Sequence, residues 1–370
     1  MGFIRHLRDA VKLMQLPRDQ RRLIVYSEGE NYWPHLAGLV AELLDKSELP
    51  VCYITSSDND PGLLLEHSNY QAFLTDESYV RNWLFENIDT DVMLMTMPDL
   101  HQYQVKRSKH PVHYIYLQHS LVSLQMVYRR GAFDYYDTIF CAGPHHMEEI
   151  RAMEAKDELP AKNLVAHGYG RLDAILSENQ ERLYKSVPVG SPQHVLIAPS
   201  WGDQMTIESG IAEQIVDKLL GQGSKVTLRP HPQTIRLASN KVDAIVNKHS
   251  NNPLFCYEAN VAGQESLHAS DLMISDWSGA ALDYALGLGK PVLFVDVPRK
   301  INNPDYMELG LEPIEVTIRS LLGGLVDEKT LDLSVTQNPV DIEQWVFNPG
   351  CSAKYGADYI IKLMETSELD

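Results

Sequence analysis

Short apolar runs alternate with helix-like stretches along almost the whole chain, and this alternation constrains the fold more than any other feature. In the first half, we predict strands at residues 23–26, 51–55, 92–96, 113–117 and 138–141. Helical patterns at 33–44 and 79–87 lie between them. Strands that alternate with helices are typical of a parallel sheet covered by helices on both faces.

A polar stretch at residues 177–192 interrupts the alternation and ends in Pro188, Gly190 and Pro192, so it is predicted to be an interdomain linker. Beyond it, strands are predicted at 195–198, 226–228, 254–257, 272–274 and 292–295, and helices at 207–220 and 280–288. A last helix at 357–365 is long enough to cross back to the first domain.

The 370 residues are too many for one ordinary domain and fit two. We expect an acceptor-side domain at 1–176, a linker at 177–192, a donor-binding domain at 193–345 and a C-terminal helical segment at 346–370. Two Rossmann-like domains with parallel sheets facing a central cleft make a GT-B-like arrangement plausible. The alternation alone does not separate it from other two-domain α/β folds.

Charge and cysteine content exclude several classes of protein. The formal net charge of −18 argues against a general nucleic-acid binder, which needs a basic surface. The four cysteines are far apart, so neither a zinc knuckle nor a disulfide framework is indicated, and reduced cytoplasmic thiols are expected. We find no apolar run of about 18 residues and no signal peptide.

Residues 1–25 combine basic residues with apolar residues at helical spacing, among them Phe3, Ile4, Leu7 and Val11. Such a helix can pack on the first domain with a solvated basic face. The alternative is a peripheral contact with an anionic membrane, here the inner face of the cell membrane.

The segment from Ser275 to Asp283 stands where a predicted strand ends and a helix begins. Ser278 and Gly279 place small groups and free backbone N–H donors at a helix N-terminus, whose partial positive charge favours a phosphate. Asp283, one turn further along, is placed to meet a hydroxyl of the ligand. Simple N-capping by Ser278 is compatible with this interpretation.

Arg229 and His231 lie in Leu-Arg-Pro-His-Pro at the end of another predicted strand. The prolines on both sides of His231 restrict the backbone and hold the imidazole in one place. An arginine and a positioned histidine can neutralise a leaving diphosphate, although a single histidine is more often structural.

His119 follows the predicted strand at 113–117, in the first domain. A neutral imidazole on that wall of the cleft can take the proton of an attacking hydroxyl. The alternative is a hydrogen-bonded histidine that supports its loop.

Two further clusters follow strands. In Gly-Tyr-Gly-Arg-Leu-Asp, Arg171 either binds phosphate or pairs with Asp173. In Ala-Pro-Ser-Trp, Ser200 and the loop backbone offer donors to a diphosphate, and Trp201 either stacks on a base or fills the core.

Taken in order, these clusters resemble the CDP-glycerol glycerophosphotransferase family, the GT-B-fold enzymes of teichoic acid and capsule synthesis. The resemblance runs from about 114 to 305. Its pieces are QHS around His119, GYGRLD at 168–173, APSW at 198–201, LRPHP at 228–232 and SDWSGAALDYALGLGKPVLF at 275–294.

The resemblance implies that His119 is the catalytic base and that His231 supports the donor phosphates. It also implies that Ser275, Asp276 and Ser278 line the same pocket. The expected activity is transfer of glycerol phosphate, or a related alditol phosphate, from a CDP-activated donor to a hydroxyl of a cell-surface glycan or glycolipid. We expect no cofactor and no metal ion, because basic side chains and a helix N-terminus can carry the charge.

The chain departs from the family at two places. Ser120 stands where the family usually has glycine, and Gly202 and Asp203 stand where an arginine is common. These departures leave donor and acceptor open. A GT-B glycosyltransferase using a nucleotide sugar, such as CMP-Kdo, is the main alternative, and a non-catalytic nucleotide- or glycan-binding module is the third.

Overall fold

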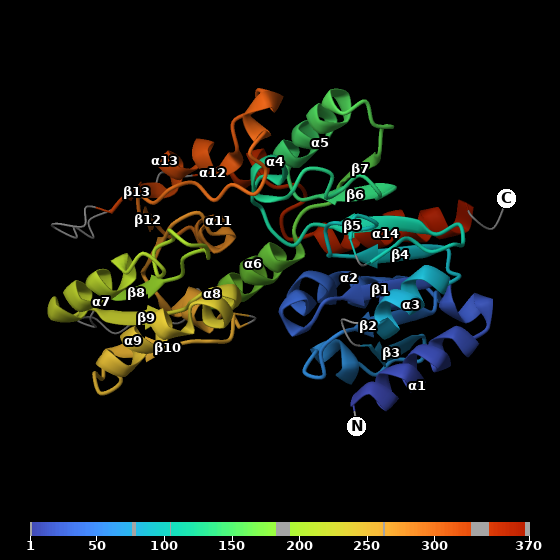
Figure 1. Cartoon of the computed structure of the whole chain (residues 1–370), viewed down its shortest axis with the longest axis horizontal. Helices are drawn as coiled ribbons and strands as arrows, with labels where there is room; N and C mark the ends of the chain where they lie inside the picture. The colour runs from blue at the N-terminus through green and yellow to red at the C-terminus, as the bar shows by residue number, and fades with distance from the viewer. Residues whose placement is uncertain are drawn as a thin grey trace.

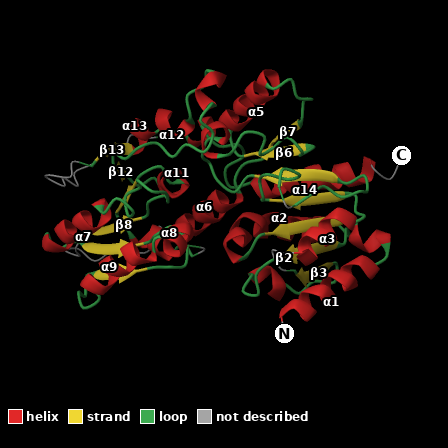
Figure 2. Cartoon of the chain, viewed as in Figure 1, coloured by secondary structure: helices red, strands yellow, loops and turns green. Residues whose placement is uncertain are grey.

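The computed structural model describes residues 2–75, 79–103, 105–182, 193–261, 263–326 and 340–366. Over these residues the chain forms two parallel β-sheets, one of seven strands and one of six. Helices cover both faces of each sheet, and the two sheets stand side by side in the long direction of the molecule (Figures 1 and 2). The prediction of an α/β chain with two parallel sheets is confirmed.

The first sheet has the strand order β3-β2-β1-β4-β5-β6-β7, and every neighbouring pair is parallel. The order reverses between β1 and β4. Its strands are β1 (Leu23–Ser27), β2 (Val51–Thr55), β3 (Tyr70–Leu74), β4 (Val92–Met95), β5 (His113–Leu117), β6 (Thr138–Cys141) and β7 (Asn163–Ala166).

The second sheet repeats this topology with the order β10-β9-β8-β11-β12-β13, again all parallel. Its reversal lies between β8 and β11, and ligands of open α/β sheets bind at such a point. Its strands are β8 (His194–Ile197), β9 (Lys225–Leu228), β10 (Phe255–Tyr257), β11 (Leu272–Ser275), β12 (Val292–Phe294) and β13 (Gly323–Leu325).

Two apolar layers enclose the first sheet. On one face, α1 (Gly2–Gln15) and α3 (Tyr79–Asn87) pack with Ala10, Leu13 and Leu84 in the core. On the other face, α2 (Trp33–Lys46) packs against α14 (Ser352–Thr366), and Leu39 and Ile360 belong to one cluster. The helices α4 (Leu124–Val127) and α5 (Pro144–Lys156) follow β5 and β6.

Two apolar layers also enclose the second sheet. One face carries α7 (Ile211–Gly221) and α9 (Ser239–His249). The other carries α6 (Gly170–Arg182), α10 (Glu265–Ala269), α11 (Gly279–Leu288), α12 (Ile314–Thr317) and α13 (Arg319–Leu322). The short helix α8 (Pro232–Leu237) follows β9.

Helix α6 is shared between the halves, because it packs on α2 as well as on α11. It continues six residues into the stretch predicted to be a linker, and residues 183–192 of that stretch lie outside the described residues. The helix predicted at 207–220 begins only at Ile211, because Gly210 before it adopts a left-handed φ of 87°. Strands β3, β7 and β13 were not predicted.

Candidate active site

The loops after β8 and β11 meet at the reversal point of the second sheet, and Asp276 holds them together. Its Oδ1 accepts hydrogen bonds from the backbone N–H groups of Ser200 (2.7 Å) and Trp277 (2.6 Å). Its Oδ2 accepts from the N–H (3.2 Å) and the hydroxyl (2.7 Å) of Thr206. Asp276, which was predicted to bind the donor, is buried, and its hydrogen bonds hold the two loops in place.

Two predicted serines lie beside Asp276. The Ser275 hydroxyl is fully buried and donates to the carbonyl of Ala198 at 2.8 Å, which ties β11 to the end of β8. The Ser200 hydroxyl is also buried, and its Oγ has no hydrogen-bond partner among the described residues. Of the two, Ser200 therefore retains an unused polar group beside the loops.

The N-terminus of α11 is the predicted phosphate site. Ser278 caps it, with Oγ accepting from the N–H of Ala280 at 3.3 Å, and Ser278 and Gly279 remain partly exposed. A side chain at Gly279 would place its Cβ 2.6 Å from the Oγ of Ser120 and 3.4 Å from Val122. The wall that carries His119 and Ser120 thus lies directly on this helix end, and glycine permits that approach.

Three predicted residues form one buried charge cluster. The Arg171 Nε lies 3.3 Å from Asp283 Oδ2, and Arg171 also donates to the carbonyl of Val261 at 3.0 Å. Arg229 donates to the carbonyls of Val261 (2.6 Å) and Gly263 (2.7 Å). Burial raises the pKa of Asp283 to about 6 although both arginines lower it, and burial lowers the pKa of Arg229 to about 10.

The alternative pairing of Arg171 with Asp173 is wrong. The Asp173 carboxylate instead accepts from the backbone N–H groups of Gly350 (2.7 Å) and Ser352 (2.8 Å) at the start of α14. The arginine therefore belongs to the cluster with Asp283, and the aspartate belongs to the connection with α14.

His231 caps the short helix α8. Its Nδ1 accepts from the N–H of Gln233 at 3.1 Å, and Pro232 occupies the first turn. Burial, and then the nearby charge of Lys300, lowers the pKa of His231 to about 3. The imidazole is therefore neutral at pH 7, and any proton on the ring is carried by Nε2.

His119 lies in an aromatic cage. Its Nδ1 lies 3.2 Å from the hydroxyl of Tyr116 and its Nε2 lies 3.4 Å from the hydroxyl of Tyr128. Tyr169 donates to its backbone carbonyl at 3.1 Å, and the Tyr32 ring packs edge-on at 5.4 Å. Burial lowers the pKa of His119 to about 4, so this ring is also neutral at pH 7.

Several residues of the site were missed by sequence reasoning. They are Tyr32, His35, Tyr116, Tyr128 and Lys300. Only Tyr116 carried a signal, because it stands three residues before His119 on the same strand end. The others reach the site from other loops and helices.

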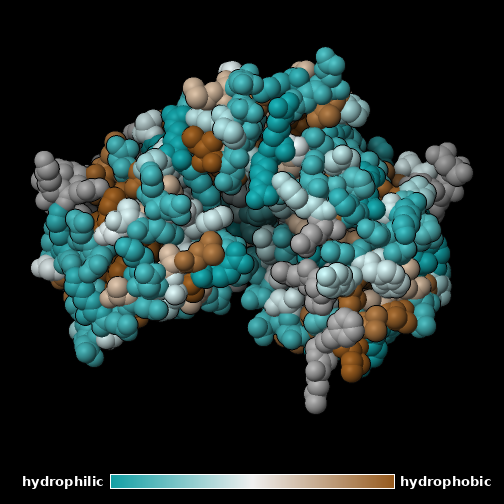
Figure 3. All heavy atoms as spheres, viewed as in Figure 1, coloured by the Kyte–Doolittle hydropathy of each residue, from teal (hydrophilic) through white to brown (hydrophobic). Residues whose placement is uncertain are grey.

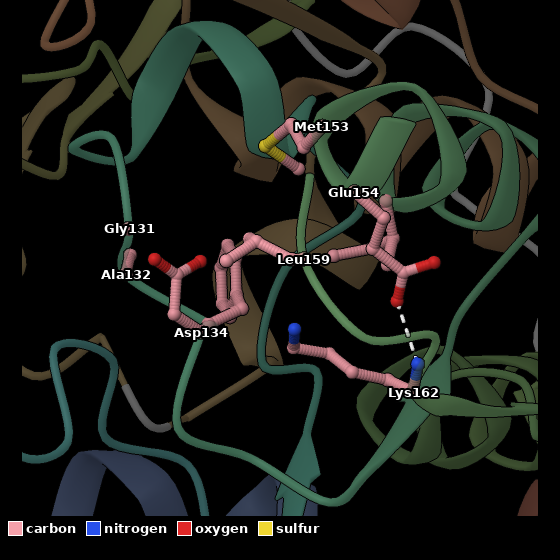
Figure 4. A pocket seen from close by; sticks show the side chains of 9 residues that line it. Gly131, Ala132, Asp134, Met153, Glu154, Leu159 and Lys162 are labelled. Atoms are coloured by element: carbon pink, nitrogen blue, oxygen red, sulfur yellow. Dashed lines mark hydrogen bonds between the residues drawn. The ribbon is translucent and has the colours of Figure 1, made fainter. Parts of the chain in front are cut away.

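A separate hollow lies in the first half between α5 and the loop at 131–134 (Figure 4). Its lining includes Phe133, Asp134, Met153 and Lys162. None of the predicted site residues lines it, so it is not part of the candidate active site.

The described residues contain no group of three or more His, Cys, Asp or Glu side chains that could hold a metal ion. Within the same ranges, no helix has the length and apolar content needed to span a bilayer.

Comparison with solved structures identifies the fold. A structure of the wall teichoic acid polymerase TagF matches with a TM-score of 0.60 and 15% identity, covering 98% of this chain and 94% of that chain. A structure of a TagF variant with one histidine changed to asparagine, soaked with CDPG, matches with a TM-score of 0.62 and 16% identity, and with the same coverage. The structure of UDP-GlcNAc 2-epimerase from Methanocaldococcus jannaschii matches with a TM-score of 0.53 and 11% identity, covering 93% of this chain and 99% of that chain. The fold is therefore GT-B-like.

Sequence comparison matches part of the chain to a known family. No curated protein sequence matches this chain. Residues 128–299, which include the clusters around Arg171, Arg229, His231 and Ser278, match the family model described as CDP-Glycerol:Poly(glycerophosphate) glycerophosphotransferase. The match covers slightly less than half of the chain, which over these residues is similar to that family.

Proposed function

We propose that this enzyme transfers glycerol phosphate, or a related alditol phosphate, from a CDP-activated donor to a hydroxyl of a cell-surface glycan or glycolipid. The observation that carries the proposal is the contact between the His119–Ser120 wall and the N-terminus of α11 at Gly279. It brings a neutral imidazole next to a helix end suited to phosphate. The family match and the TagF structure soaked with CDPG support the choice of donor.

The donor diphosphate binds at the N-terminus of α11. The free N–H groups there carry partial positive charge, and Ser278 and Gly279 leave them accessible. The surface is hollowed between the two halves, which gives the donor and acceptor a way in (Figure 3). Arg171 and Arg229 do not bind the phosphates directly, because their donors are already bonded to the carbonyls of Val261 and Gly263; their charge stabilises the negative charge at longer range.

The chemical step is an attack of the acceptor oxygen on the distal phosphorus of the donor. The new O–P bond forms as the bond from that phosphorus to the bridging oxygen breaks, and CMP leaves with the electron pair. The acceptor proton moves to His119, at the nitrogen that Tyr128 now approaches at 3.4 Å. A weakly basic imidazole suffices, since phosphoryl transfer through a loose transition state depends mainly on positioning and charge stabilisation.

The test is release of CMP from CDP-glycerol by the purified enzyme with a glycan or glycolipid acceptor, in parallel with a panel of nucleotide sugars. We expect release from CDP-glycerol, with or without EDTA, and a loss of 100-fold or more in His119→Asn. His110→Asn is the matched control, because His110 is exposed. Release only from a nucleotide sugar would establish glycosyl transfer instead. Binding of CDP without any turnover would establish a binding module.

We also propose that α1 holds the enzyme on the inner face of the cell membrane. Ile4, Leu7 and Val11 are 75%, 43% and 39% exposed, although Ala10 and Leu13 on the opposite side are buried. Hydrophobic residues are visible on the surface at α1 in Figure 3. Exposed Arg8 and Lys12 lie beside the apolar strip, and such a combination favours anionic lipid.

Flotation with vesicles containing anionic lipid tests this contact. Wild type should float, and the triple change Ile4→Ser, Leu7→Ser and Val11→Ser should remain at the bottom of the gradient with unchanged CMP release. The comparison variant carries Leu64→Ser, an exposed leucine distant from α1 in sequence. Equal flotation of wild type and the triple variant would refute the role of α1.

A further inference from the structure

A lysine after β12 lies among the loops of the candidate donor site. The Nζ of Lys300 is 4.3 Å from the centroid of the Trp201 ring. The Trp201 ring in turn lies 6.0 Å from the His231 ring. These residues follow β8, β9 and β12 of the same parallel sheet, so strand ends along one edge bring them together, as expected for a ligand site in such a sheet.

The other two basic residues predicted at this site are already occupied. Arg229 donates to two backbone carbonyls and to the hydroxyl of Ser266, and Arg171 is bonded to Asp283 and to a carbonyl. Lys300, by contrast, makes no hydrogen bond or ion pair to any residue in the described ranges. Its three N–H donors are available to a ligand.

Two polar groups without partners belong to the loop that carries Trp201. The Ser200 Oγ and the Glu208 Oε2 are buried, and neither has a hydrogen-bond partner within the part of the chain that the structure describes. Glu208 Oε1 accepts from the Thr234 hydroxyl at 2.7 Å, which anchors this carboxylate at the start of α8. Unsatisfied buried polar groups are costly, and the Ser200 hydroxyl can remove that cost by donating to a ligand oxygen.

Simple charge balance does not account for Lys300. The carboxylates of Asp276 and Glu208 favour its charged form, but neither approaches it as an ion pair. Both oxygens of Asp276 already accept two hydrogen bonds each. Burial lowers the pKa of Lys300 to about 8, which means that the ammonium is held in a partly desolvated position without a close counter-charge.

We propose that Lys300 binds a phosphate of the nucleoside diphosphate donor, with the Trp201 ring as the platform that holds the ammonium in place. The proposal rests on the proposed function and names the residue that supplies the free positive charge of the donor site. The flexible stem ends in a compact charge, which suits one phosphate oxygen group. Gly202, which follows Trp201, brings no charge, so this cation comes from a loop about a hundred residues further along the chain.

Binding of CDP, measured by isothermal titration calorimetry, tests the proposal without requiring turnover. Lys300→Met keeps the aliphatic stem against Trp201 and should weaken CDP binding by tenfold to about a hundredfold, the range for a charged hydrogen bond. Lys300→Arg should restore most of the affinity. Arg236→Gln removes an exposed charge from α8 and should leave affinity within about twofold. Unchanged CDP affinity in a folded Lys300→Met would refute the proposal.

The pH dependence gives a second readout that a purely structural lysine would not change. Lys300 is charged below its pKa of about 8, so CDP affinity should fall as pH rises through that value. The charged and titratable groups that face it are Asp276, Glu208 and His231, and the pKa of His231 is lowered to about 3. In Lys300→Arg the fall should disappear. A fall near pH 8 that persists in Lys300→Arg would contradict the assignment.

The two proposals fail in different ways. If wild type binds CDP through Lys300 but releases no CMP from CDP-glycerol, the donor or the reaction is wrong and the phosphate contact stands. If wild type turns over CDP-glycerol and Lys300→Met does so with unchanged KM, the reaction stands and the Lys300 contact is wrong.

Discussion

Replacing Glu315 by glutamine should make the protein more stable above neutral pH. Glu315 belongs to α12 in the second half, and its Oε1 accepts from the N–H of Ser123 in the first half at 3.0 Å. Its Oε2 is buried and has no partner among the described residues. Glu149 of α5 binds the next two residues of the same segment, accepting from the N–H groups of Leu124 and Gln125.

The size of the effect follows from burial. Desolvation raises the pKa of Glu315 from 4.5 to about 7, and raises the pKa of Glu149 well above its usual range, with Glu315 adding to that shift. Between pH 4.5 and about 7 the folded state holds the Glu315 proton more tightly than the unfolded chain, so stability falls as pH rises. At about 1.4 kcal/mol for each pH unit, the loss is about 3 kcal/mol once both states are ionised.

Glutamine keeps an oxygen for the Ser123 N–H and cannot ionise. The free energy of urea unfolding of Glu315→Gln should therefore match that of wild type near pH 4.5 and exceed it by about 3 kcal/mol at pH 8. Glu312→Gln, an exposed residue paired with Arg299 at 3.4 Å, is the control and should change stability by less than about 0.5 kcal/mol. Parallel pH curves for wild type and Glu315→Gln would refute the reasoning.

Three further changes test the site. Gly279→Ala should cost about 1–2 kcal/mol and lower turnover, because its Cβ would lie 2.6 Å from Ser120 Oγ, and adding Ser120→Gly should recover both; a neutral single change would contradict the contact. Asp283→Ala leaves buried arginines without their carboxylate and should lower the free energy of unfolding by about 3 kcal/mol in urea titrations; a loss below about 1 kcal/mol would oppose this. Tyr116→Phe should lower kcat about tenfold at unchanged donor KM, because Tyr116 orients His119; an equal kcat would exclude that role.

Central strands were the most predictable part of the fold. A strand such as β1, fully buried between helices, must be apolar throughout, so a short run of apolar residues reveals it. The edge strand β7 is partly exposed, and β13 begins with two glycines, so neither shows such a run. Helix α5 was missed because it buries His146 and Glu149, which breaks the apolar spacing that sequence reasoning depends on.

The candidate site was predictable wherever a residue follows its own strand directly. His119, His231 and Ser278 were predicted this way, because parallel strands bring their carboxyl ends to one edge. Lys300 and Tyr128 were not, because their positions depend on loops that fold over the sheet. The internal bonds of Asp276 and Arg229 were likewise invisible, since their partners lie on other loops.

The two connections between the halves lie against each other. The Asn348 side chain donates to the carbonyl of Ala166 at 2.7 Å, and Asp173 of α6 bonds to Gly350 just before α14. Gly168, at a φ of 106°, passes so close to the Phe347 carbonyl that a Cβ there would lie 2.3 Å from its oxygen. Two covalent crossings at one place act as a single pivot. Any opening of the halves to admit an acceptor is therefore a rotation about this point.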